Sequence, residues 1–296
     1  MQTLSDETIR EALSQRTVTL PDGTRIPALG QGTWNMGDNP ARREEEVQAL
    51  RLGIELGMTV VDTAEMYGEG LSESLVGEAI KGKRDEVFLV SKVYPHNAGG
   101  ERLARSCEAS LQRLGTDHLD LYLLHWRGSI PLAETVQGME QLVAEGKIRR
   151  WGVSNLDTSD MQELWKVPGG EACAVNQVLY HIASRGIEYE LQPWLQQQRI
   201  PMMAYSPLAQ GGSMRKGMLE NKVVQSIAKE YQVSPSQLIL AWTIRKSGVL
   251  SIPKASSSDH VRENAAAASI DLREDTLAQL EEAFPAPKRK VPLDII

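Results

Sequence analysis

Four side chains that can give up or stabilise a proton stand just after short apolar runs of the chain. They are Asp62, Tyr67, Lys92 and His125, and three of them end or follow the runs VVD, FLVSK and LYLL. A phenol can give a proton to a carbonyl oxygen, an ammonium and a carboxylate can tune that phenol, and an imidazole can orient the carbonyl. The set is therefore suited to proton transfer onto a carbonyl oxygen.

The acidity of Tyr67 is the critical quantity, because a free phenol has a pKa of about 10. Lowering that pKa by about 3 units takes roughly 4 kcal/mol of extra stabilisation of the phenolate. The charge of a Lys92 ammonium in a partly dry pocket would stabilise the phenolate by an amount of this size. Asp62 would keep the ammonium charged and fixed in place. Taken singly, each of the four residues also has a structural interpretation, as a helix cap, a rim side chain or a half-buried ring.

The elements that would position these residues alternate regularly. Eight apolar runs predict buried strands, at 28–32, 59–62, 87–92, 118–124, 148–153, 174–179, 201–205 and 249–252. Between them lie amphipathic stretches that predict helices, among them 42–56, 102–114, 132–145, 157–166, 189–198 and 222–231. Helix ends are indicated by Gly57, Gly115 and Gly146. Eight such units predict an α/β protein with a (β/α)8 barrel, in which the carboxyl ends of the strands form the active-site rim.

The N-terminal part of the chain adds to this barrel. Residues 17–26 alternate around a Pro-Asp-Gly turn, which predicts a β-hairpin that closes the bottom of the barrel. Residues 1–16 are expected to form a polar extension, and no linker or repeat divides the single domain expected over 1–296. A doubly wound sheet is the alternative. However, the segment from Gly30 to Asn35 lacks the third glycine of a dinucleotide fingerprint and has no helix directly behind it.

Composition excludes several classes of function. The formal net charge of −7 argues against a nucleic-acid surface. Cys107 and Cys173 have no metal or redox spacing, and the five histidines form no H-x-H or H-E-x-x-H pair, so we expect no metal. No apolar segment of a signal peptide opens the chain, and no uncharged run is long enough to span a bilayer. We therefore expect a cytoplasmic protein without nucleic-acid or membrane partners.

Eight short strings, in order from the first strand to the last, resemble those of the aldo-keto reductases. They are GTW at 32–34, DTAEMY at 62–67, LVSK at 89–92, LHW at 124–126, GVSN at 152–155, NQ at 176–177, AYSPL at 204–208 and IPK at 252–254. Within that family the chain is similar to bacterial members that reduce methylglyoxal and other small aldehydes. The resemblance implies an NADPH-dependent oxidoreductase that converts an aldehyde or ketone to the alcohol by hydride transfer.

The same resemblance implies roles for individual residues. The family's catalytic positions are matched by Asp62, Tyr67, Lys92 and His125, with Tyr67 as the general acid. The implied substrate contacts are Trp34, Tyr67, His125 and Trp126, and Tyr94 is either a further wall of the pocket or a packing residue. The implied cofactor contacts are Gly32, Thr33, Trp34, Ser154, Asn155, Gln177, Tyr205, Ser206, Leu208, Gln210, Lys254, Ser256, Ser257, His260, Glu263 and Asn264.

The adenosine end of the cofactor site departs from the family pattern. Lys254 matches the lysine that contacts the 2′-phosphate, but His260 stands where many members have an arginine. Arg262 follows two residues later, and the sequence leaves open whether its side chain reaches the 2′-phosphate. Because a bidentate guanidinium is lost at this position, an NADH-preferring member is an alternative to the NADPH enzyme.

Two other classes of function are left open by the residues. One is a cofactor-binding regulatory subunit built on the same barrel, and the other is a barrel hydrolase that uses no nicotinamide. The expected partner is a small carbonyl substrate, and the protein is expected to be a monomer or a weak homo-oligomer.

Overall fold

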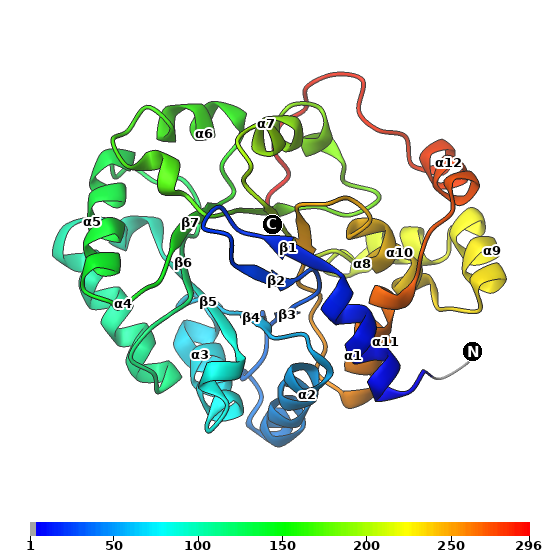
Figure 1. Ribbon diagram of the computed structural model, residues 1–296, viewed down its shortest axis with the longest axis horizontal. Helices are drawn as coiled ribbons and strands as arrows, with labels where there is room; N and C mark the ends of the chain where they lie inside the picture. The colour runs from blue at the N-terminus through cyan, green and yellow to red at the C-terminus, as the bar shows by residue number, and fades with distance from the viewer. Residues whose placement is uncertain (1–3) are drawn as a thin grey trace.

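Eight parallel strands curl around the centre of the computed structural model, which describes residues 4–296 (Figure 1). They are β3 Gln31–Gly32, β4 Val60–Asp62, β5 Phe88–Val93, β6 Leu121–Leu124, β7 Trp151–Ser154, β8 Asn176–Leu179, β9 Met202–Tyr205 and β10 Val249–Ser251. Each strand pairs with the next along the chain, and parallel bridges from Leu29 to Ser251 and from Gly32 to Lys254 join the first strand to the last. The predicted barrel is confirmed, and every strand ends within one residue of its predicted end.

Helices cover the outside of the barrel (Figure 1). They are α2 Arg43–Leu56, α3 Leu71–Ile80, α4 Gly100–Leu114, α5 Leu132–Ala144, α6 Thr158–Leu164, α7 Leu191–Gln197, α8 Gly212–Leu219, α9 Lys222–Tyr231, α10 Pro235–Thr243, α11 Ser258–Ala266 and α12 Glu274–Ala283. In α4 the buried residues Leu103, Cys107, Leu111 and Leu114 recur every three or four positions, so that one face packs on the barrel. Gly115 then ends the helix with a φ of 64°.

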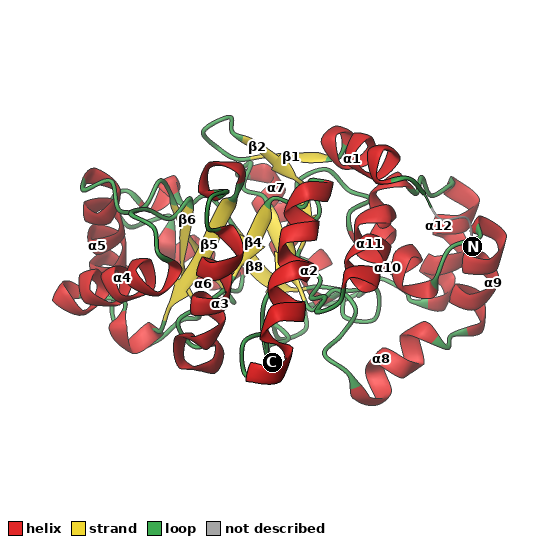
Figure 2. Cartoon of the chain, turned by 90° about the horizontal axis from the view of Figure 1, so that it is seen from below, coloured by secondary structure: helices red, strands yellow, loops and turns green. Residues whose placement is uncertain are grey.

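A two-stranded hairpin crosses one end of the barrel, on the side away from the C-terminus of the chain (Figure 2). It consists of β1 (Thr17–Thr19) and β2 (Arg25–Pro27), which pair antiparallel as the sequence predicts. Val18 and Ile26 are buried partners in this hairpin, so its inner face covers the end of the barrel core.

The segment expected to be a polar extension contains a packed helix. This helix, α1 (Asp6–Gln15), buries Ile9 and Leu13 and contacts both α2 and α11. Residues 1–3 of the expected extension lie outside the described part of the chain. Within residues 4–296, no helix combines the length and the apolar character that crossing a bilayer requires.

Candidate active site

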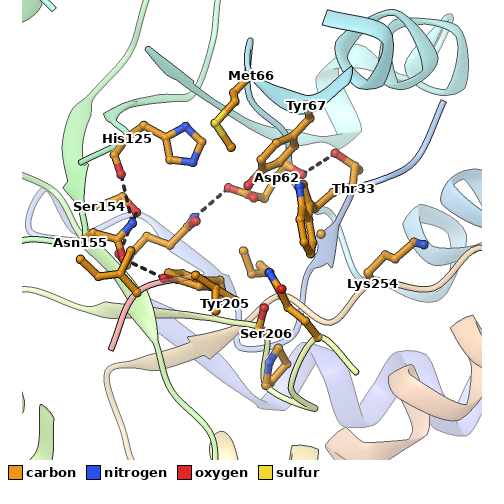
Figure 3. Close-up of a pocket in the computed structure, with 18 of the residues that line it drawn as sticks. Thr33, Asp62, Met66, Tyr67, His125, Ser154, Asn155, Tyr205, Ser206 and Lys254 are labelled. Carbon is orange, nitrogen blue, oxygen red and sulfur yellow. Dashed lines mark hydrogen bonds between the residues drawn. The ribbon is translucent and has the colours of Figure 1, made fainter. Parts of the chain in front are cut away.

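A cavity of about 700 Å³ opens at the carboxyl ends of the strands (Figure 3). This volume lies within the range of roughly 300–1,000 Å³ that is typical of small-molecule and cofactor sites. The cavity is lined by Gly32, Thr33, Trp34, Asn35, Asp62, Met66, Tyr67, His125, Trp126, Arg127, Ser154, Asn155, Asp160, Gln177, Tyr205, Ser206, Pro207, Leu208, Ala209, Gln210, Arg215, Ile252, Pro253, Lys254, Ile295 and Ile296. Every strand end except that of β5 contributes to this lining, and Lys92 of β5 is fully buried.

The ammonium of Lys92 is the centre of the polar cluster on this cavity. Its Nζ donates to Asp62 Oδ2 at 2.7 Å, to the carbonyl of Thr63 at 2.8 Å and to the hydroxyl of Tyr67 at 3.1 Å. Asp62 Oδ1 in turn accepts a hydrogen bond of 2.8 Å from the amide of Gln177. Lys92 is fully buried, so its charge is met by protein groups rather than by bulk water.

Burial sets the ionisation of this cluster. It raises the pKa of Tyr67 above its usual value, and the charge of Lys92 opposes that rise without reversing it. Burial also favours a neutral Lys92, but the Asp62 carboxylate and Tyr67 outweigh it and the pKa of Lys92 is raised. The net lowering of the phenol pKa that we expected is therefore wrong for this arrangement. At neutral pH, Tyr67 keeps its proton next to a charged lysine.

His125 stands beside Tyr67, with the two ring centroids 5.8 Å apart in an edge-on arrangement. Burial, helped by the charge of Lys92, lowers the pKa of His125 to about 2, so the imidazole is neutral. Its Nδ1 is buried and has no hydrogen-bond partner within residues 4–296. A neutral imidazole carries one N–H, and Nε2 is the better position for it because Nδ1 has no acceptor.

Amide and hydroxyl groups form the next part of the wall. Ser154 Oγ donates to the carbonyl of Gln177 at 2.9 Å, and Asn155 Nδ2 donates to the carbonyl of His125 at 3.2 Å. The Tyr205 hydroxyl donates to Asn155 Oδ1 at 2.8 Å. Asn155 has a φ of 57°, a conformation that asparagine tolerates better than most residues and that turns its amide toward the cavity (Figure 3).

The far end of the cavity is formed by the segments that follow β9 and β10. Leu208 and Gln210 line it from the β9 side, where Ser206 and Ala209 have left-handed φ values of 49° and 54°. Lys254 lines it from the β10 side (Figure 3). This end therefore combines exposed backbone in a tight loop with one lysine, which suits an anionic group.

Five of the expected cofactor residues lie beyond the cavity, on or next to α11. Ser256 and Ser257 precede the helix, and Ser257 Oγ accepts from the N–H of His260, which is exposed. The Glu263 carboxylate accepts a hydrogen bond from Ser234, and Asn264 is buried. Their contacts with a cofactor stay a prediction.

Two residues that the sequence left undecided are placed elsewhere. Arg262 donates from Nε to Asp6 Oδ1 at 3.2 Å, so it turns toward α1 and not toward the cavity. Tyr94 is not part of the lining. Its ring meets Trp126 edge-on at 6.0 Å and stacks on His96 at 4.9 Å, so it supports the wall from behind.

Several lining residues were missed by the sequence analysis. Arg127 and Asp160 both line the cavity and form an ion pair, with Arg127 Nη1 3.3 Å from Asp160 Oδ1. Arg215 reaches the cavity from α8. Ile295 and Ile296 cover part of it although they lie far from any strand end. Only the apolar character of that last pair, which comes after the basic stretch 288–290, offered a signal.

Metal chemistry and thiol chemistry find no support in the described residues. Within 4–296, no group of three or more histidine, cysteine, aspartate or glutamate side chains is placed to hold a metal ion. Burial raises the pKa of Cys107 and of Cys173 to about 12, so both thiols stay protonated and unreactive.

Comparison with known proteins identifies the family. The sequence profile of the aldo/keto reductase family matches residues 28–284. The chain belongs to this family. The reductase is 57% identical to the methylglyoxal reductase YeaE of Escherichia coli K12 over 284 residues, which are 96% of this chain and all of that protein. It is 33% identical to the glyoxal reductase of Bacillus subtilis over 271 residues, or 90% of this chain and 91% of that one.

Solved structures agree with this assignment. An aldo/keto reductase of Klebsiella pneumoniae, crystallised with NADP and acetate, superposes on the reductase with a TM-score of 0.93 at 58% identity, covering 95% of this chain and 99% of that one. A thermostable aldo-keto reductase crystallised with the inhibitor epalrestat gives 0.82 at 39% identity, covering 90% and 98%. The resemblance inferred from the eight sequence strings is confirmed.

Proposed function

We propose that this aldo/keto reductase uses NADPH to reduce small aldehydes, with methylglyoxal as the favoured type, to the corresponding alcohols. The observation that carries the proposal is the Tyr67 hydroxyl, held 3.1 Å from the Lys92 ammonium on the wall of the cavity. The relatives named for methylglyoxal and glyoxal reduction support the substrate class.

The residues of the cavity suit a nicotinamide dinucleotide. The hydroxyl and amide groups of Ser154, Asn155 and Gln177 offer donors and acceptors for a carboxamide, and Tyr205 offers a flat ring face beside them. Lys254 stands at the opposite end, where a phosphate would need a cation. When bound, the reduced nicotinamide supplies a hydride to the carbonyl carbon.

The protein's own part in the reaction is the proton and the orientation of the carbonyl. His125, as a neutral imidazole, donates from Nε2 to the carbonyl oxygen and turns it toward Tyr67. Tyr67 gives its phenolic proton to that oxygen, and Lys92 stabilises the phenolate that is left. Asp62 holds Lys92 in place through the contact of 2.7 Å and is itself fixed by Gln177.

Aromatic and aliphatic side chains favour a small substrate. Trp34 and Trp126 stand on the cavity wall near Tyr67, and Ile295 and Ile296 approach the same space. These groups exclude water around the reacting carbonyl, which strengthens the electrostatic effects of Lys92 and His125.

The test is the substitution Tyr67→Phe. We expect NADPH binding, followed by protein fluorescence, to change less than about twofold, while NADPH oxidation with methylglyoxal falls by at least about 100-fold because the proton donor is gone. Tyr189→Phe, which removes a hydroxyl from an exposed tyrosine, is the matched control and should keep full turnover. Turnover retained in Tyr67→Phe would remove Tyr67 from this role. Comparing kcat/KM for methylglyoxal, aromatic aldehydes, sugars and ketosteroids tests the substrate class.

A further inference from the structure

The seam that closes the barrel brings the segment after β3 next to the segment after β10, which carries Lys254. This is the edge of the cavity at which we expect the adenosine of the cofactor. The backbone N–H of Gly32 donates to the carbonyl of Pro253 at 3.2 Å, so the segments after β3 and after β10 leave the barrel side by side. The first of these segments ends in a short 3₁₀ turn, η1 (Pro40–Arg42), and the second leads into α11. Residues far apart in sequence are therefore neighbours at this edge.

Arg42 is the residue that crosses this seam. Its Nη2 donates to Ser256 Oγ at 2.9 Å, and Ser256 lies two residues after Lys254. The position of Arg42 is set by its surroundings, because Asn39 Oδ1 caps the turn through the N–H of Ala41 at 3.0 Å. The helix that follows, α2, packs against α11 (Figure 2). The guanidinium is thus presented to the start of α11 by a fixed backbone.

Within the described part of the chain, few cations face the start of α11, so a further cation such as Arg42 could contribute to binding an anion there. Lys254 is exposed, and α11 begins beside it with Asp259, an acidic residue, in its first turn. The arginine within α11 itself, Arg262, is turned to Asp6 and does not face this edge. Lys254 is therefore the cation next to the start of α11, while Arg215 reaches the cavity from α8 and any further cation at this edge must also come from outside α11.

We propose that Arg42 is a specificity residue for the cofactor and pairs with the 2′-phosphate of NADPH together with Lys254 and Ser256. The inference rests on the proposed use of NADPH. A guanidinium can give two parallel N–H groups to a phosphate, which a lysine cannot. Arg42 keeps N–H groups available for a phosphate. One of its N–H groups donates to Ser256, and its Nε lies 3.5 Å from Glu45 Oε2 in an exposed ion pair. The contact discriminates between the two cofactors because NADH has no phosphate at this position.

The test compares the dissociation constants of NADPH and NADH, measured by quenching of protein fluorescence. We expect Arg42→Gln to weaken NADPH binding by about tenfold, the effect typical of losing a charge-assisted hydrogen bond, and to change NADH binding by less than about twofold. Adenosine 2′,5′-bisphosphate, which has no nicotinamide, should lose affinity by the same factor as NADPH. Glu45→Gln should tighten NADPH binding slightly, because it releases the guanidinium.

Two arginines serve as matched controls. Arg43 is next in sequence but pairs with Glu78 at 2.8 Å, and Arg262 lies on α11 but pairs with Asp6. Arg43→Gln and Arg262→Gln remove the same charge and should leave the ratio of the two dissociation constants unchanged. Equal weakening of NADPH and NADH in Arg42→Gln, or no change in either, would overturn the inference. Failure of the proposed function would look different, since the unaltered protein would then bind NADPH without reducing aldehydes or would not bind it.

Discussion

At the scale of single residues, the proposed proton donor, Tyr67, and the proposed tuning group, Lys92, are separate side chains in contact. Tyr67 is held as a neutral phenol because burial opposes its ionisation, while Lys92 stays charged because Asp62 is 2.7 Å away. Such an arrangement favours reduction, in which the phenol must start with its proton. In the proposed mechanism, the lysine stabilises the phenolate only as it forms, which is where stabilisation accelerates a reaction.

The ionisation of the site predicts the dependence of its rate on pH. The proposed mechanism of reduction needs protonated Tyr67 and neutral His125. The raised pKa of Tyr67 keeps its proton throughout the neutral range, and the pKa of His125 at about 2 keeps the ring neutral there. We therefore expect kcat for reduction to vary less than about twofold between about pH 6 and pH 9 and to fall only as the pH approaches the raised pKa of the phenol.

The reverse reaction supplies the control for this profile. In the proposed mechanism, oxidation of an alcohol requires the phenolate of Tyr67, so its rate should rise with pH over the range in which reduction is level. Measuring kcat in both directions over one pH series checks both statements. A loss of reduction below about pH 6.5 would instead indicate that His125 titrates near its usual pKa.

At the scale of elements, the seam between β3 and β10 is the critical junction. It closes the barrel through the Gly32–Lys254 bridge and carries the contact of Thr33 Oγ1 with the carbonyl of Asp62 at 2.9 Å. Gly32 is required there because of close backbone approach. A Cβ at this position would lie 2.7 Å from the carbonyl oxygen of Ile252, a backbone atom that moves aside less easily than the end of a flexible side chain.

Gly32→Ala is therefore expected to weaken both fold and site. The clash should lower the free energy of unfolding by about 1–3 kcal/mol, the usual cost of overpacking, and should reduce NADPH affinity because the seam borders the proposed cofactor site. Urea unfolding and a fluorescence titration measure the two effects. Gly217→Ala in α8 is the control, since a Cβ there meets no atom within 4 Å. Its unfolding free energy should stay level or rise slightly. Equal stability of both variants would show that the seam tolerates the extra atom.

At the scale of the whole molecule, the N-terminal region fastens the end of the barrel. Arg16, just after α1, donates from Nε to the carbonyl of Ala268 at 2.6 Å and from Nη2 to the carbonyl of Ile270 at 2.9 Å. It thus ties the first helix to the segment between α11 and α12, across 252 positions of sequence. The cavity lies elsewhere, so this contact concerns stability and not catalysis.

Arg16→Met should consequently separate stability from activity. Two partly buried carbonyls lose their donor, which costs about 1–3 kcal/mol in the free energy of unfolding. The value of kcat with methylglyoxal, measured well below the unfolding temperature, should not change. Arg10→Met, at an exposed position of α1, is the matched control and should leave both quantities as they are. A loss of kcat in Arg16→Met at full folding would show that the N-terminal region communicates with the site.

Much of the site was accessible from sequence because its signals are local. Each strand end is marked by an apolar run that stops at a polar residue, as at Asp62, Lys92 and His125, and parallel strands of a barrel bring such ends to one rim. The net direction of the Tyr67 pKa was not accessible, because it depends on how much of the ring is buried. The lining by Ile295 and Ile296 was indicated only by the apolar character of the pair, since no strand leads to it.

The amino-acid sequence by itself determined the order of strands and helices and the kinds of side chain at the rim, since hydrophobic period and helix-ending glycines act over a few residues. Tertiary structure alone decided which residues the distant arginines contact. Arg42 meets Ser256 across 214 positions, while Arg262 turns to Asp6 across 256. The physical reason is closure of the barrel: when the first strand pairs with the last, contacts form that no local pattern encodes.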